Sequence, residues 1–217
     1  DKPMPASKVS TLDTQKLKRL ETDFLMRYPG GFDDPDMLAL TKKHNFDKMV
    51  ALTHSAFDKV ACSNIHVTAD NMIKAVSRSS MISMYEKPKF RDFVKNLNEY
   101  DKAFLVEALR NMLHGKQQFG FEAMVDILRT EKLAKWSLVS VIPAYYAPQK
   151  QVFVKPTTAK NILKHFDLDD PVYKPAPTWD FYKKYRQLVI AGKAKVNKSL
   201  SPTNVAFTRF LIMTVDR

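Results

Sequence analysis

Apolar side chains recur at intervals of three or four positions along most of the chain, which is the spacing of one buried face of an α-helix. The clearest segment is 101–114, which is followed by the helix-ending residue Gly115. Its apolar stripe consists of Phe104, Leu105, Ala108, Leu109, Met112 and Leu113. Similar spacing recurs in 13–27, 34–44, 46–61, 64–80, 88–97, 121–130, 157–166, 178–190 and 201–214. The pattern therefore predicts a mainly α fold, a compact arrangement of about ten helices.

Residues that favour the first turn of a helix mark several of these starts. Asp34 is expected to cap the helix that begins at Pro35, because its carboxylate can accept a hydrogen bond from an unpaired backbone N–H group. Thr68, Thr157 and Thr178 are expected to cap later helices in the same way.

The segment 137–154 is the ambiguous part of the chain. Residues 137–142 and 151–154 are rich in β-branched side chains, and Pro143 and Pro148 interrupt the stretch between them. Two structures fit this pattern: a small β-hairpin near 137–154, or a buried helix followed by an extended strand. The fold is therefore expected to contain at most a small β-hairpin.

A division of the chain into two parts is expected in the same region. Residues 1–135 are predicted to form an N-terminal helical bundle and residues 136–217 a basic, aromatic-rich helical subdomain. A single domain over 11–217 fits the pattern as well. Residues 1–10 are expected to be a flexible lead-in. The link 167–177 contains three prolines, so it is expected to be rigid and to lie extended over the surface.

The chain carries a formal net charge of +12 at pH 7 and has a sequence pI near 9.6. Residues 150–198 hold ten lysines and one arginine against four aspartates, and aromatic side chains are interleaved with this charge. Such a chain attracts polyanions, most commonly nucleic acid, with anionic membrane surfaces and acidic proteins as alternatives. The longest apolar run, 136–147, is too short to cross a bilayer, so no membrane span is predicted.

The first candidate site is the helix start Lys155-Pro156-Thr157-Thr158-Ala159-Lys160. Backbone N–H groups are unpaired at a helix start and the helix dipole is positive there, so this position can bind a phosphate group. Lys164 adds another cation, and the nearest carboxylate in the sequence is Asp167. The alternative is that Thr157 only caps the helix while the lysines point to water.

The second candidate site is the segment 173–186, in which aromatic and basic side chains alternate. One side of a helix here would carry Trp179, Tyr182, Lys183 and Arg186, with Lys184 as a further cation. The cations would neutralise phosphate groups, while Trp179 and Tyr182 would stack on bases or shape a groove. The alternative is that the proline-containing link folds back and buries the aromatic side chains in the core.

The sequence shows no recognisable catalytic motif. Its five glycines form no phosphate-binding loop, dinucleotide fingerprint or nucleophile elbow. The single cysteine, Cys62, excludes an intramolecular disulfide and fits a reducing compartment, so a cytoplasmic location is expected. His54 and Asp58 are spaced to pair on a helix, and the carboxylates of 33–36 are close enough in sequence to suit Mg²⁺, although helix capping explains them more simply. No metal and no cofactor are predicted.

The leading hypothesis is a helical protein that binds nucleic acid, DNA or RNA, through its C-terminal third without catalysing a reaction. One alternative is an enzyme that acts on a phosphate-bearing substrate. The other is a helical interaction module whose basic surface meets an acidic protein partner. The sequence assigns no catalytic residue.

Overall fold

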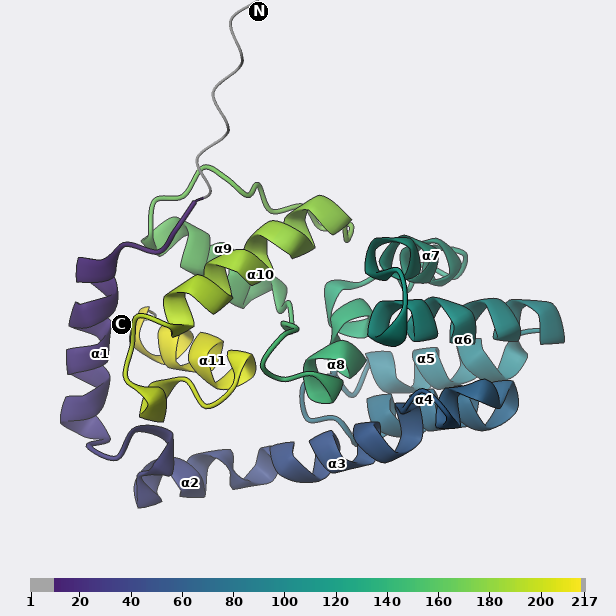
Figure 1. Ribbon diagram of the computed structural model, residues 1–217, viewed down its shortest axis with the longest axis horizontal. Helices are drawn as coiled ribbons and strands as arrows, with labels where there is room; N and C mark the ends of the chain where they lie inside the picture. The colour runs from purple at the N-terminus through teal and green to yellow at the C-terminus, as the bar shows by residue number, and fades with distance from the viewer. Residues whose placement is uncertain (1–9, 216–217) are drawn as a thin grey trace, which may run out of the picture.

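The computed structural model describes residues 10–215, and this part of the chain consists of α-helices, short 3-10 turns and connecting loops, without a strand (Figure 1). The mainly α prediction is confirmed, with eleven α-helices in the described part where about ten were expected. Most of the predicted lead-in lies outside the described residues. The helices are α1 (Thr14–Arg27), α2 (Pro35–Thr41), α3 (Phe46–Phe57), α4 (Ile65–Arg78), α5 (Glu86–Asn96), α6 (Glu99–His114), α7 (Gln117–Arg129), α8 (Trp136–Tyr146), α9 (Pro156–His165), α10 (Trp179–Lys193) and α11 (Asn204–Val215).

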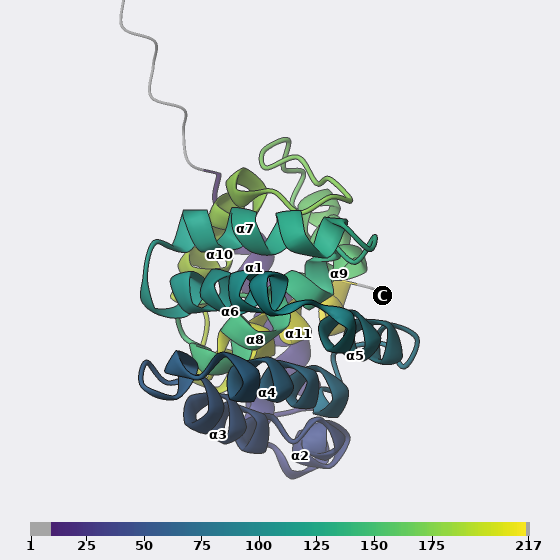
Figure 2. The ribbon, with the colours of Figure 1, turned by 90° about the vertical axis from the view of Figure 1, so that its right-hand side faces the viewer.

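The first and the last helices of the chain lie together. Figure 1 shows α1, α9, α10 and α11 at one end of the molecule, α4 to α7 at the other end, and α8 between them. Phe24 of α1 meets Phe210 of α11 edge to face, with ring centroids 5.4 Å apart. Figure 2 shows the opposite end, where α7 and α6 are layered over α4 and α3. No helix within residues 10–215 is long and apolar enough to cross a bilayer.

Two of the predicted helix caps are confirmed. The Asp34 carboxylate accepts a hydrogen bond from the Asp36 N–H group at 3.0 Å, at the start of α2. The Thr178 hydroxyl accepts one from the Phe181 N–H group at 3.3 Å, at the start of α10. Each bond satisfies a backbone donor that the helix itself leaves unpaired.

Two other caps were assigned to the wrong residue. Asn64 caps α4, and Thr68 is buried within that helix. Helix α9 begins at Pro156, with Lys155 as the preceding residue, so Thr157 lies inside the first turn. The reason is that proline has a fixed φ and no N–H group, which suits the first helical position.

Of the two structures that fit the segment 137–154, the hairpin does not form and the helical part of the other does, as α8, but residues 147–155 form a turn and a loop without a strand. Helix α8 contains Pro143, and its residues 138–145 are all buried. Burial on every side explains the β-branched composition, because tertiary packing overrides the weak local preference. The Ser140 hydroxyl donates to the Trp136 carbonyl oxygen at 2.7 Å and accepts from the Val154 N–H group at 2.9 Å. This hydroxyl ties α8 to the chain that leads into α9.

Trp136 joins helices on both sides of the boundary predicted near residue 136. Its ring lies 6.2 Å from that of Phe121 on α7 and 5.2 Å from that of Phe181 on α10, measured between centroids. Its indole N–H group donates to the Lys174 carbonyl oxygen at 2.8 Å, which holds the proline-containing link against α8. The division into two domains stays a prediction, and the unfolding of Trp136 variants tests it.

We expect the Cys62 thiol to be inert in the folded protein. The residue is only 1% exposed, its thiol donates to the Phe57 carbonyl oxygen, and burial raises the pKa of the thiol to about 11. Because the thiolate is the reactive form, a disulfide reagent added at pH 8 should label the native protein much more slowly than the protein in denaturant. Complete labelling of the native protein at the rate of a free thiol would contradict this burial.

Candidate anion-binding surface

Of the ten residues of the two candidate sites, Lys155 directly precedes α9 and the others lie on α9 and α10, and the two helices use them differently. Helix α9 buries Ala159, Ile162 and Leu163 against the core. The opposite side of α9 faces solvent, and we call it the α9 basic face. It consists of Lys155, Thr157, Lys160 and Lys164, all of them exposed.

The lysines of the α9 basic face have no carboxylate partner within residues 10–215. The Lys160 ammonium lies 4.9 Å from the centroid of the Tyr173 ring, which orients this side chain without neutralising it. The first turn of α9 contains no acidic residue and its start has no side-chain cap. The helix start therefore adds positive potential to that of the lysines.

The aromatic residues of α10 are largely used in packing. Tyr182 is 1% exposed, and its ring lies 5.2 Å from that of Phe121 and 5.8 Å from that of Trp179. Its hydroxyl donates to the Gln151 side-chain oxygen at 2.6 Å, and burial raises the pKa of the phenol to about 12. The structure therefore leaves no face of Tyr182 open to a base. Trp179 is half-buried and keeps part of its surface in solvent.

The cations of α10 are mostly engaged as well. The Arg186 guanidinium donates to the side-chain oxygens of Gln117 and Gln151, at 2.9 and 3.0 Å. Lys184 pairs with Asp170 at 3.0 Å and with Asp180 at 3.4 Å, and the hydrogen bond to Asp170 raises the pKa of its ammonium.

Among the predicted cations of α10, only the exposed Lys183 has no hydrogen-bond or ion-pair partner within the described residues. The fold thus separates the two predicted sites into a free basic face on α9 and a structural cluster on α10.

Carboxylates are scarce in the last third of the chain. Fifteen of the 35 lysines and arginines follow Glu131, but only five of the 23 carboxylates do. Three of those five are used near the C-terminal end of α9 and the start of α10: Asp167 pairs with Lys16, while Asp170 and Asp180 pair with Lys184. The negative charge is therefore concentrated away from the N-terminal end of α9, where the surface stays positive.

The sequence reading missed Arg209, which the structure places beside the start of α9. Arg209 is the sole charged residue of α11, a helix that is otherwise apolar or neutral. It lies in the wall of a hollow of about 290 Å³, which we call the Arg209 hollow. The polar residues that line it are His44, Ser80, Lys155, Thr158, Thr208 and Arg209. The sequence does show an isolated cation in an apolar helix. It does not show the residues around this cation, because they come from four separate parts of the chain.

The charged residues that line the Arg209 hollow are Lys155 and Arg209, with His44 beside them. A neighbouring hollow of about 560 Å³ shares His44 and Arg209 and contains Asp33 and Asp47. Burial lowers the pKa of the Arg209 guanidinium, which reflects the loss of water around a charge. Burial also lowers the pKa of His44, and the charges of Arg209 and Lys43 lower it further. No carboxylate lines the Arg209 hollow.

No protein-family model, curated protein or solved structure matches this chain. The surface must therefore be interpreted from its own geometry.

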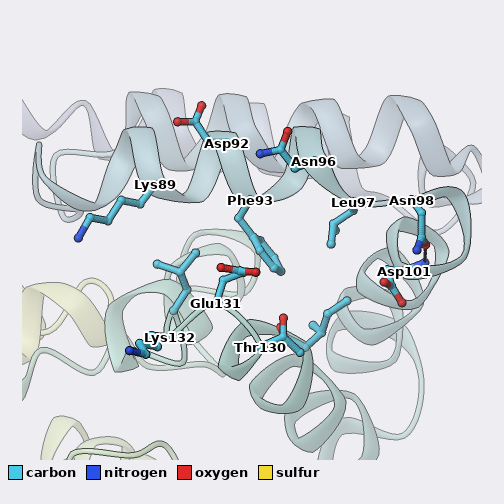
Figure 3. A pocket seen from close by; sticks show the side chains of 12 residues that line it. Lys89, Asp92, Phe93, Asn96, Leu97, Asn98, Asp101, Thr130, Glu131 and Lys132 are labelled. Atoms are coloured by element: carbon cyan, nitrogen blue, oxygen red, sulfur yellow. Dashed lines mark hydrogen bonds between the residues drawn. The ribbon is translucent and has the colours of Figure 1, made fainter.

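A larger hollow, of about 790 Å³, lies between α5, the start of α6 and the end of α7 (Figure 3). Figure 3 shows Phe93 of α5 and Leu97, which follows α5, pointing into it. Its charged lining residues are Lys89, Asp92, Asp101, Glu131 and Lys132. This mixture of both signs does not favour an anion as the Arg209 hollow does, and none of the ten predicted site residues lines it.

The pair expected to suit acid–base chemistry does not form. The His54 ring stacks on Tyr146 with centroids 4.7 Å apart, and the Asp58 carboxylate accepts from the Ala61 N–H group at 2.6 Å. Over residues 10–215, no three His, Cys, Asp or Glu side chains lie close enough together to share a metal ion. The enzyme alternative therefore gains no named catalytic residue from the described structure.

Proposed function

We propose that this protein binds nucleic acid without catalysing a reaction, and that the α9 basic face is its principal contact surface. The observation that carries the proposal is a set of three exposed lysines, Lys155, Lys160 and Lys164, with no carboxylate partner among the described residues. Cations that are already paired inside a protein contribute little to the binding of a polyanion. Unpaired cations can neutralise phosphate groups, and this releases the counterions condensed on the nucleic acid.

The proposed contact is with the phosphate backbone rather than with base edges. Tyr182 is buried and Arg186 is held by glutamine side chains, so the α10 cluster offers little for base recognition. Trp179 is the one aromatic residue of the predicted pair that retains exposed surface. We therefore expect weak dependence on nucleotide sequence, as is usual where phosphate contacts dominate.

The proposal is tested by replacing Lys155, Lys160 and Lys164 together with glutamine. Fluorescence anisotropy with a labelled duplex and a labelled single strand should show affinity reduced by about tenfold or more, because three phosphate contacts are lost. The matched control replaces three exposed lysines of the N-terminal half, at positions 59, 74 and 95, and changes the net charge equally.

The control variant should retain most of the affinity. Equal losses in both variants would show that net charge rather than the α9 basic face determines binding. No binding of the unmodified protein at low salt would overturn the proposal, and the basic face would then be assigned to an acidic protein partner.

A further inference from the structure

The Arg209 hollow brings cations and hydroxyl groups together from parts of the chain that are far apart in sequence. His44 and Ser80 come from the N-terminal half, Lys155 and Thr158 from the start of α9, and Arg209 from α11. The His44 Nδ1 atom lies 2.7 Å from the Ser80 hydroxyl oxygen, so this histidine is already oriented by a hydrogen bond. The packing of α9 against α11 sets the distance between the start of α9 and Arg209.

Arg209 is the most informative residue of this hollow. Its guanidinium makes no hydrogen bond and no ion pair within residues 10–215, although burial is sufficient to lower its pKa. A guanidinium removed from water without a partner lowers the stability of a fold. An anion bound at this position would complete the hydrogen bonds of the guanidinium, whose planar fork matches two oxygens of a phosphate group.

We propose that the Arg209 hollow binds one phosphate group, with Arg209 as the principal ligand and Lys155 and His44 at its sides. Hydroxyl groups of Ser80 and Thr158 line the same space and can donate to phosphate oxygens, whereas the Thr208 hydroxyl donates to the Val205 carbonyl oxygen. A space of about 290 Å³ also admits the sugar that carries the phosphate. The α9 basic face begins at Lys155, so a strand bound on that face would reach the hollow.

This inference deepens the proposed function, because a nucleic-acid strand would supply the phosphate, but its first test is independent of nucleic acid. Thermal unfolding is followed in buffers of equal ionic strength with and without 20 mM inorganic phosphate. A ligand that binds only the folded state raises the melting temperature, and we expect a saturable increase of about 3 °C.

The variant Arg209→Met keeps the length and apolar stem of the side chain and should abolish this increase, while Lys155→Gln should reduce it. The control Lys183→Gln changes the same charge at an exposed position outside the hollow and should leave the increase unchanged. If Arg209→Met fails to fold, the proposal is tested by the other two variants: the increase in melting temperature should be smaller for Lys155→Gln than for Lys183→Gln. An equal increase in all variants would show a general salt effect and would overturn the proposal.

A second arm identifies the source of the phosphate. Oligonucleotides with and without a 5′-phosphate, and a mononucleotide, are compared in the anisotropy assay with the unmodified protein and with Arg209→Met. A preference for the 5′-phosphorylated strand that Arg209→Met removes would assign the hollow to a strand end. Competition by the mononucleotide alone would assign it to a small ligand. If inorganic phosphate binds but no oligonucleotide does, the site stands and the proposed nucleic-acid function fails.

Discussion

Replacing Trp136 with alanine is expected to lower the free energy of unfolding by about 4 kcal/mol. Trp136 is 2% exposed, packs on Phe121 and Phe181, and donates a hydrogen bond to the Lys174 carbonyl oxygen. The substitution removes the largest side chain of α8 and leaves a cavity at the junction of three helices. Chemical denaturation followed by circular dichroism measures the loss, and a decrease below about 1 kcal/mol would contradict this packing.

The same experiment tests whether the chain has two domains. Trp179 is the other of the two tryptophans, so its fluorescence reports on α10 in the variant. If the molecule is one cooperative unit, the fluorescence and circular dichroism transitions of Trp136→Ala coincide and move together. Two separated transitions, with only one of them shifted, would support the division near residue 136. The conservative variant Trp136→Phe should keep most of the stability, since it retains an aromatic ring and loses the hydrogen bond.

Replacing Gly120 with alanine is expected to lower the free energy of unfolding by about 3 kcal/mol. A Cβ atom at this position of α7 would lie 2.5 Å from the backbone nitrogen of Met112 and 2.7 Å from the carbonyl oxygen of Ala108, both on α6. These are helix backbone atoms, so the clash is relieved only if the two helices separate. Helix propensity alone predicts the opposite sign, because alanine stabilises a helix by about 1 kcal/mol relative to glycine.

The sign of the Gly120→Ala effect therefore distinguishes close helix packing from local propensity. Gln118→Ala is the control on the same helix: the side chain is exposed and its loss removes only a hydrogen bond to Glu122. This control should change the stability by less than about 0.5 kcal/mol. An increase in stability for Gly120→Ala would show that α6 and α7 are not in the close contact described.

The sequence predicted the helices well where the apolar stripe was wide and the ends were marked. The segment 101–114 and the caps at Asp34 and Thr178 depend on local chemistry, which the sequence displays directly. The segment 137–154 was ambiguous because a strand and a helix buried on all sides both tolerate β-branched residues. Neighbours from other helices, which the sequence does not display, decided that the first part is helical.

The candidate site shows the same limit. Exposed lysines on α9 were predictable, because a helix has one buried face and its charged residues must lie on the other. The burial of Tyr182 depends on Phe121, about 60 residues earlier, and the spacing within α10 does not reveal it. The sequence did not predict Arg209 as a site residue for the same reason. Its role depends on His44, Ser80 and Lys155, which the fold brings to the same hollow.

The salt dependence of nucleic-acid binding tests the central claim most directly. Lys155, Lys160, Lys164 and Arg209 would neutralise three to four phosphates, so the logarithm of the duplex association constant should fall against the logarithm of salt concentration with a slope of about −3. The variant that lacks the three α9 lysines should lose most of this slope, and the control with three glutamines in the N-terminal half should keep it. A slope near zero for the unmodified protein, or an unchanged slope after loss of the α9 lysines, would contradict binding through this surface.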